Sequence, residues 1–203
     1  MPYREEDTSI YWIDSDTELA RAVESWGAII ALDTEFIRTN TFYPIPGLYQ
    51  VASNSNIFLI DPLLIEEWQP FKDYLLDPET VKVLHACQED LELIYAHLQI
   101  VPRNVVDTQL ANAYVSENYS LSYAKLVKQN LGLQVDKQQT RSDWLQRPLS
   151  DDQLHYAVVD VEHLVAIFEQ LQQQLCDKSR WSWFQEDMLQ RANYREPQPK
   201  LSV

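Results

Sequence analysis

The chain is poor in glycine and cysteine. Its 203 residues include three glycines, Gly27, Gly47 and Gly132, so neither a G-x-G-x-x-G dinucleotide loop nor a P-loop can be formed. The two cysteines, Cys87 and Cys176, do not form a C-x-x-C pair. We therefore expect neither a structural zinc site nor a disulfide framework, and a reducing, cytoplasmic compartment fits this cysteine usage best.

Positive charge is also scarce, and long apolar runs are missing. The chain carries 16 Lys and Arg against 31 Asp and Glu, which gives a net charge of −15. This balance argues against a generic basic protein that binds nucleic acid by neutralising phosphates. It is compatible with an enzyme that handles phosphates through bound metal ions. No apolar stretch reaches about 18 residues and the N-terminus has no apolar signal core, so no membrane partner is expected.

The hydrophobic pattern predicts a mixed α/β fold. Hydrophobic residues make up 45% of the chain, as in globular domains. Five segments have the length and composition of strands: 28–36, 48–52, 57–60, 81–84 and 105–106. Short links join the first three, which predicts antiparallel neighbours, and strands alternate with helices afterwards. We expect a five-stranded sheet with helices on both faces, followed by helix from about Ser150. Ser9–Ile13 alternates only weakly and could be a further short strand.

Two acids follow the most apolar of these segments. In AIIALDTEF, Asp33 and Glu35 are separated by one residue, so their side chains share one face of a strand. Like charges on one face repel each other unless a partner neutralises them, and a hard divalent cation prefers oxygen ligands. The alternative is a turn or helix-capping role, which is common for Asp at a strand end.

Two further acids and a tyrosine can complete such a site. Asp90 follows the fourth predicted strand, at the start of a helix, where stabilisation of the helix dipole is the simpler explanation. Asp160 lies in an apolar helical segment, where an unpartnered acid is costly to bury. Tyr156 lies four residues before Asp160 and therefore shares its helix face, although a tyrosine at such a position is more often part of the core or its rim.

Other polar residues have simpler explanations. Asp107 in VVDT is expected to cap a helix or to end a strand. The four histidines, His85, His97, His155 and His163, do not show the spacing of a zinc site. The segments KQQTR and RPL can be ordinary surface.

Several segments together resemble one enzyme family. They are DTEFIRTNTFYP, GLYQV, IDPL, HACQEDLEL, VVDTQ and DKQQTRSDWLQRPLSDDQLHYAVVDV. From about Ile30 to Leu175 the chain resembles ribonuclease D, in the tyrosine-containing branch of the DEDD superfamily of 3′→5′ exonucleases. The last segment is the most specific, because SDW-x-x-RPL leads directly into Y-x-x-x-D.

The resemblance implies a ribonuclease H-like fold and five catalytic residues, Asp33, Glu35, Asp90, Tyr156 and Asp160. It selects Asp90 over its neighbour Glu89. It also implies two divalent ions, Mg²⁺ or Mn²⁺, as cofactors, with all four acids as metal ligands. By analogy, Asp33, Glu35 and Asp160 would hold the ion that activates water. Asp33, with Asp90 through a water, would hold the ion at the leaving 3′ oxygen, and Tyr156 would orient the attacking water.

The resemblance also suggests substrate-binding residues. Thr34, Phe36 and His85 would lie near the terminal nucleotide. A second group would line or shape the substrate groove: Gln50, Arg141, Trp144 and Arg147. The two arginines can contact phosphates, and Trp144 can either stack on a base or pack beneath the catalytic helix.

The resemblance finally suggests domains and a function. We expect an exonuclease domain over residues 1–175 and a helical extension or linker over 176–203. The helical HRDC module that usually follows in bacterial ribonuclease D is expected to be incomplete here, either because the chain is trimmed or because it is naturally short. The expected function is removal of 5′-mononucleotides from single-stranded RNA 3′ ends, with transfer RNA precursors as partners. Alternatives are a DNA exonuclease with the same chemistry and a non-catalytic RNA-binding module.

Overall fold

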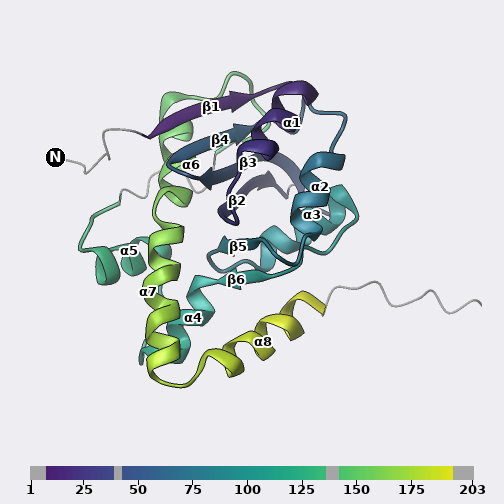
Figure 1. Cartoon of the computed structure of the whole chain (residues 1–203). Helices are drawn as coiled ribbons and strands as arrows, with labels where there is room; N and C mark the ends of the chain where they lie inside the picture. The colour runs from purple at the N-terminus through teal and green to yellow at the C-terminus, as the bar shows by residue number, and fades with distance from the viewer. Residues whose placement is uncertain (1–7, 39–42, 136–141, 194–203) are drawn as a thin grey trace, which may run out of the picture.

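A computed structural model describes residues 8–38, 43–135 and 142–193. Its centre is one six-stranded sheet, in the order β1-β4-β3-β2-β5-β6 (Figure 1). The strands are β1 (Ser9–Ile13), β2 (Ile29–Ile37), β3 (Ile45–Ser53), β4 (Asn56–Ile60), β5 (Val81–Leu84) and β6 (Val105–Asp107). The helices are α1 (Asp16–Ser25), α2 (Gln69–Leu76), α3 (Gln88–Leu98), α4 (Thr108–Val115), α5 (Tyr123–Leu131), α6 (Asp151–Glu162), α7 (Leu164–Asp177) and α8 (Trp181–Asn193).

The pairing of the strands confirms the predicted mixed sheet and adds one strand. β3 pairs antiparallel with β2 and with β4. On the other side of β2, β5 pairs parallel with β2, and β6 pairs parallel with β5. The sixth strand is β1, which pairs parallel with β4 along its full length. Four of its five residues are exposed. An edge strand that buries so little does not need a regular apolar alternation, which is why its sequence pattern is weak.

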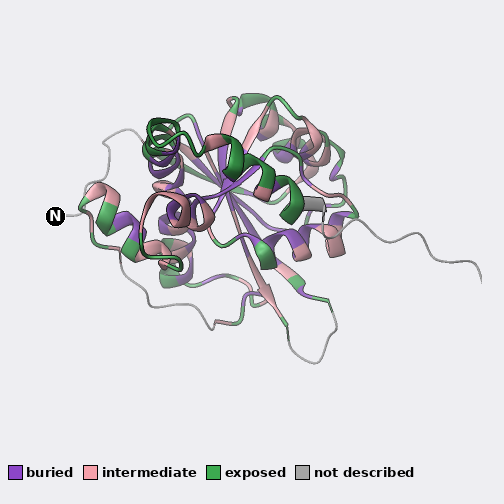
Figure 2. Cartoon of the chain, turned by 90° about the horizontal axis from the view of Figure 1, so that it is seen from below, coloured by how far each residue is buried: buried purple, intermediate pink, exposed green. Residues whose placement is uncertain are grey.

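Helices cover both faces of the sheet. The face of β3 that carries Tyr49 packs against the region of α2. The ring of Tyr49 contacts the rings of Trp68, just before α2, and of Phe71, within α2. The opposite face is covered by α6, which contacts β2, β3 and β4, and by α7, which contacts β2 and β5. Strand β2 lies between these two layers, and Ile30, Ala31 and Leu32 are completely buried there. Figure 2 shows the buried strands at the centre of the molecule.

The C-terminal part is helical, as predicted. Residue 175 lies in the last turn of α7, and α8 then packs against α7, β6 and α4. On α8, Phe184 and Met188 are buried in this contact. In the part of the chain that the structure describes, no helix combines the length and the apolar character that crossing a membrane requires.

Candidate active site

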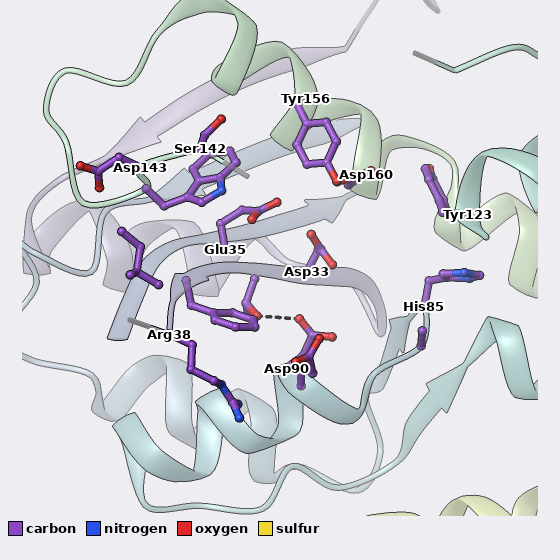
Figure 3. Close-up of a pocket in the computed structure, with 16 residues that line it drawn as sticks. Asp33, Glu35, Arg38, His85, Asp90, Tyr123, Ser142, Asp143, Tyr156 and Asp160 are labelled. Carbon is purple, nitrogen blue, oxygen red and sulfur yellow. Dashed lines mark hydrogen bonds between the residues drawn. The ribbon is translucent and has the colours of Figure 1, made fainter. Parts of the chain in front are cut away.

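The predicted catalytic residues line one pocket of about 810 Å³ beside β2 (Figure 3). The residues that form it come from β2 and the position after it, the link between β5 and α3, the start of α3, α5, α6 and the segment just before α6. Six of the lining side chains are carboxylic acids: Asp33, Glu35, Glu89, Asp90, Asp143 and Asp160. The pocket is therefore strongly acidic and suits a cation.

Three of these acids lie close enough to share an ion. Asp33, Glu35 and Asp160 each offer a carboxylate oxygen, and these oxygens lie within 4.8 Å of one another. Asp33 and Glu35 share a face because β2 is extended, and α6 packs on that face and brings Asp160 to them. An all-oxygen donor set of this size fits a hard divalent cation such as Mg²⁺ or Mn²⁺.

Burial and mutual repulsion both oppose ionisation in this cluster. Burial, together with the charges of Asp90, Asp160 and Glu35, holds the pKa of Asp33 well above its usual range. Burial and the neighbouring Asp160 and Asp90 raise the pKa of Glu35 to about 9. Without a cation these groups resist ionisation, and a bound cation would relieve that cost.

Asp90 approaches the site from α3 and is held separately from the three clustered acids. The hydroxyl of Thr34 donates a hydrogen bond of 2.6 Å to Oδ1 of Asp90. Burial raises the pKa of Asp90 to about 7, and the bond from Thr34 opposes this rise. Thr34 was expected near the terminal nucleotide. Thr34 lines the pocket, and its buried hydroxyl also orients Asp90. Its position beside a nucleotide stays a prediction.

Tyr156 points toward Asp160 across one turn of α6 (Figure 3). The helix begins at Asp151 because Ser150 and Gln153 form a reciprocal capping box. Burial, followed by the charges of Asp160 and Glu35, raises the pKa of the Tyr156 phenol far above its usual range. The phenol therefore stays protonated at neutral pH and can donate a hydrogen bond.

Besides Thr34, three of the predicted substrate residues line the pocket: Phe36, His85 and Trp144. The ring nitrogens of His85 lie 3.0 Å from Oγ1 of Thr108 and 3.1 Å from the carbonyl oxygen of Leu121, so the ring is fixed. Trp144 is only 2% exposed and its ring lies 6.3 Å from that of Tyr156. Of its two predicted roles, packing beside the catalytic helix is the one that this burial supports.

Gly47 lets the Trp144 segment approach the sheet. A Cβ atom on Gly47 would lie 2.6 Å from Cβ of Trp144 and 2.8 Å from its carbonyl oxygen, which is a steric overlap. Any other residue there would push the segment before α6 away from β3.

The structure does not bring Gln50 and Arg147 to the pocket. Gln50 pairs with Asp33 across β2 and β3, but it is completely buried and does not line the pocket. Its amide nitrogen and oxygen have no hydrogen-bond partner among the described residues. Arg141, the remaining substrate candidate, lies outside the described residues.

Arg147 joins the segment before α6 to the sheet instead of facing a substrate. Its Nε and Nη2 donate to the two carboxylate oxygens of Asp61, both at 2.6 Å. Its remaining donors reach the carbonyl oxygens of Gly47, Trp144 and Gln146. All five N–H groups are thus used, which leaves none for a phosphate.

Four polar pocket residues were not singled out from the sequence: Arg38, Tyr123, Ser142 and Asp143. Arg38 lies within the DTEFIRTNTFYP segment, so its nearness to the acids in sequence was the available signal. The hydroxyl of Tyr123 donates to the carbonyl oxygen of Val159, 36 residues away, and no local pattern indicates such a contact. Asp107, by contrast, caps α4 as predicted, by accepting from the amides of Gln109 and Leu110.

Comparisons with known proteins match most of this chain. A family model described as 3′–5′ exonuclease matches residues 10–176. A ribonuclease D from Pseudomonas paraeruginosa is 47% identical over 180 residues, which make up 88% of this chain and 48% of that protein. A ribonuclease D from Escherichia coli K12 is 42% identical over 78% of this chain and 42% of that protein. The chain thus spans about half the length of the curated relatives it matches.

Solved structures give the same result for the fold. The crystal structure of Escherichia coli RNase D, described as an exoribonuclease involved in structured RNA processing, matches with a TM-score of 0.87 at 34% identity. That match covers 95% of this chain and 51% of the other. The catalytic core of RRP6 from Trypanosoma brucei matches with a TM-score of 0.86 at 23% identity, covering 94% of this chain and 54% of that one, which supports the fold alone.

Proposed function

Because the chain belongs to the 3′–5′ exonuclease family, we propose that it is a metal-dependent 3′→5′ exoribonuclease that releases 5′-mononucleotides from RNA. The observation that carries this proposal is the cluster of Asp33, Glu35 and Asp160, whose carboxylate oxygens lie within 4.8 Å of one another. Asp90 and Tyr156 line the same pocket. A pocket with this donor set can hold cations against the anionic phosphate that is to be cleaved.

Two Mg²⁺ or Mn²⁺ ions are the proposed cofactors. Two ions would balance the roughly −4 formal charge of four ionised acids. Asp33, Glu35 and Asp160 would hold one ion, and Asp33, with Asp90 through a water, would hold the other. Such ions lower the pKa of water and stabilise charge on the attacking and leaving oxygens of a phosphodiester. Thr34 keeps Asp90 oriented for this task through its 2.6 Å hydrogen bond.

Tyr156 would position the attacking water and would not remove its proton. The raised pKa of the phenol keeps its proton in place at neutral pH. Its hydroxyl lies beside Asp160 on the same helix face, where a water between the acids and the substrate would be within reach (Figure 3). The packing of Trp144 against Tyr156 limits the movement of this ring.

The proposed substrate and domain arrangement rest on the relatives. The names of the matched curated proteins support RNA as the substrate class, and we propose 3′ processing of transfer RNA precursors as the task. We further propose that residues 1–175 form the catalytic domain and 176–203 an extension, because the family match ends at residue 176. The acids of the pocket and the net charge of −15 then require RNA to be held by metal ions and by a few local contacts.

The first experiment uses a 5′-labelled single-stranded RNA with a free 3′ end, incubated with the chain and Mn²⁺ or Mg²⁺. A ladder that shortens from the 3′ end and disappears with EDTA is the expected result. A Tyr156→Phe variant, which keeps the ring but lacks the hydroxyl, should be strongly impaired. RNA that is bound but stays intact would instead indicate a non-catalytic binding module.

A matched DNA strand in the same assay tests the substrate class. Faster shortening of DNA than of RNA would overturn the RNA assignment while leaving the chemistry in place. The released product identifies which bond is broken: a 5′-mononucleotide is expected, and a 3′-monophosphate would contradict the mechanism.

A further inference from the structure

The acidic pocket contains one arginine that the proposed chemistry does not use. Among the described lining residues, Arg38 is the only Lys or Arg, against six carboxylic acids. A nucleic acid strand that enters this pocket carries a negative charge on every linkage, so a cation within the pocket wall is the natural contact for it. The following inference rests on the proposed function.

Arg38 lies just beyond the end of β2, in the wall of the pocket. It follows the last residue of β2, Ile37, and lies five residues beyond Asp33, a distance of roughly 16 Å along an extended strand. Its side chain lies on the side of the pocket away from Tyr156 and Asp160 (Figure 3). The guanidinium carbon lies 6.0 Å from the centre of the Phe36 ring, which supports it from one side.

Arg38 has an acidic partner in the absence of substrate. Its Nη2 lies 2.9 Å from Oε2 of Glu92, and the two side chains are 37% and 24% exposed. Ion pairs with this exposure stabilise a fold only weakly. A phosphate offers the same paired oxygens as a carboxylate and suits the planar fork of a guanidinium. Glu92 lies on α3, two residues after Asp90.

We propose that Arg38 binds a backbone phosphate of the RNA upstream of the cleaved bond, and that Glu92 competes with this phosphate for the guanidinium. The pair acts as an exchangeable contact: the carboxylate of Glu92 occupies Arg38 in the free protein, and the phosphate replaces it on binding. Arg38 thus offsets part of the repulsion between RNA and the acidic pocket.

The two residues have opposite predicted effects, which separates this role from a structural one. Arg38→Gln removes the phosphate contact and should weaken RNA binding. Glu92→Gln removes the competitor and should strengthen it. A purely structural ion pair would make both variants less stable and would leave the RNA affinity of the folded protein unchanged.

The test measures KM and kcat on labelled RNA with the full chain. Arg38→Gln should raise KM about tenfold, as expected for loss of a charge-assisted hydrogen bond, while kcat changes by less than about twofold. The slope of the logarithm of the binding constant against the logarithm of the salt concentration should become less steep by about 0.7, which is the contribution of one phosphate contact on a single strand. Glu92→Gln should lower KM, and the double variant should behave like Arg38→Gln. Arg21→Gln, which changes an exposed arginine on α1 outside the pocket, is the matched control.

A binding measurement separates the proposed exonuclease function from the proposed role of Arg38. Binding of the same RNA is measured by fluorescence anisotropy in the presence of Ca²⁺. A chain that shortens RNA while Arg38→Gln keeps the wild-type KM and salt slope overturns the role of Arg38 only. A chain that binds RNA with the predicted Arg38 and Glu92 effects but never shortens it supports this contact and overturns the proposed function. A chain that neither binds nor shortens RNA overturns both.

Discussion

At the scale of single residues, the alternation of β2 determines the chemistry of the pocket. Asp33 and Glu35 project to the face covered by α6, where Asp160 joins them. Thr34, between them, projects to the other side and holds Asp90. Four acids thus gather because one strand presents alternate side chains to two different helices.

Removal of the shared acid should abolish cleavage. Asp33→Asn removes a proposed ligand of both ions, and we expect activity to fall at least about 100-fold, since metal ions contribute several kcal/mol of charge stabilisation. The fold should persist, because the change removes a charge that its neighbours repel. Rates on labelled RNA provide the measurement, with Asp73→Asn on α2 as the control outside the pocket. Activity within about tenfold of wild type would contradict the assignment.

Gln50 offers a prediction about stability. Both polar atoms of its amide are buried without a partner among the described residues, and such a group costs about 1–3 kcal/mol. Gln50→Met keeps most of the shape and removes this cost, so the free energy of unfolding should rise by about 1 kcal/mol. Urea denaturation measures the change. A loss of stability would mean that the folded protein uses this amide.

At the scale of elements, the position of α6 depends on the segment that precedes it. Residues 142–149 lie against the sheet because Arg147 connects Asp61 at the end of β4 with the carbonyl oxygen of Gly47 in β3. The capping box at Ser150 then starts α6 directly afterwards. This connection places Tyr156 and Asp160 over β2.

Loss of the Arg147 contact should therefore destabilise the protein strongly. Arg147→Gln leaves the carboxylate of Asp61, which is only 1% exposed, without its cation. A buried charge that loses its partner costs about 3–5 kcal/mol, and we expect the lower end of this range because Arg147 itself is 24% exposed. Arg147→Lys should also destabilise, since lysine cannot reproduce the paired contact. A change in unfolding free energy below about 1 kcal/mol would show that this contact is dispensable.

At the scale of the whole molecule, stability is coupled to the ionisation of the pocket. The pKa of Glu35 is raised from 4.5 to about 9 and that of Asp90 from 3.8 to about 7, with burial as the largest cause for each. The folded, metal-free protein therefore holds these protons more tightly than the unfolded chain does. Their contribution to stability is complete below about pH 4 and is lost as the pH rises through 7 and 9.

This coupling predicts a pH dependence in the presence of EDTA. The unfolding free energy of the wild type should fall between about pH 5 and pH 9. Glu35→Gln cannot ionise at this position, so its curve should be flatter over the same window. Urea denaturation at several pH values measures both curves. Parallel curves would show that Glu35 does not contribute to the pH dependence.

Metal ions should act in the opposite direction. We expect Mn²⁺ to bind the clustered acids of the folded chain and to find no such cluster in the unfolded chain, so it should raise the melting temperature. At a concentration of 100 times Kd the gain is about 2.7 kcal/mol. Asp33→Asn should reduce the shift sharply. An unchanged melting temperature at millimolar Mn²⁺, or an equal shift in the variant, would contradict a preformed site.

Several features of this protein were determined by the sequence itself, because they depend on neighbouring residues. The strand β2 and the shared face of Asp33 and Glu35 follow from a short apolar run and from alternation. The mixed sheet and the helical C-terminal part follow from periodicity and link length. The capping role of Asp107 is equally local.

Other features were decided only by the tertiary structure, because their partners are distant in the sequence. The contact between Arg147 and Asp61 joins residues 86 positions apart, so the arginine looked available for a phosphate. The burial of Gln50 depends on the helix that covers β3, and the hydroxyl of Thr34 is engaged by an acid 56 residues away. The strand β1 gains its order from pairing with β4 rather than from its own pattern. Packing of α6 on the sheet brings Asp160 close to Asp33 and Glu35, and no local sequence pattern predicts this contact.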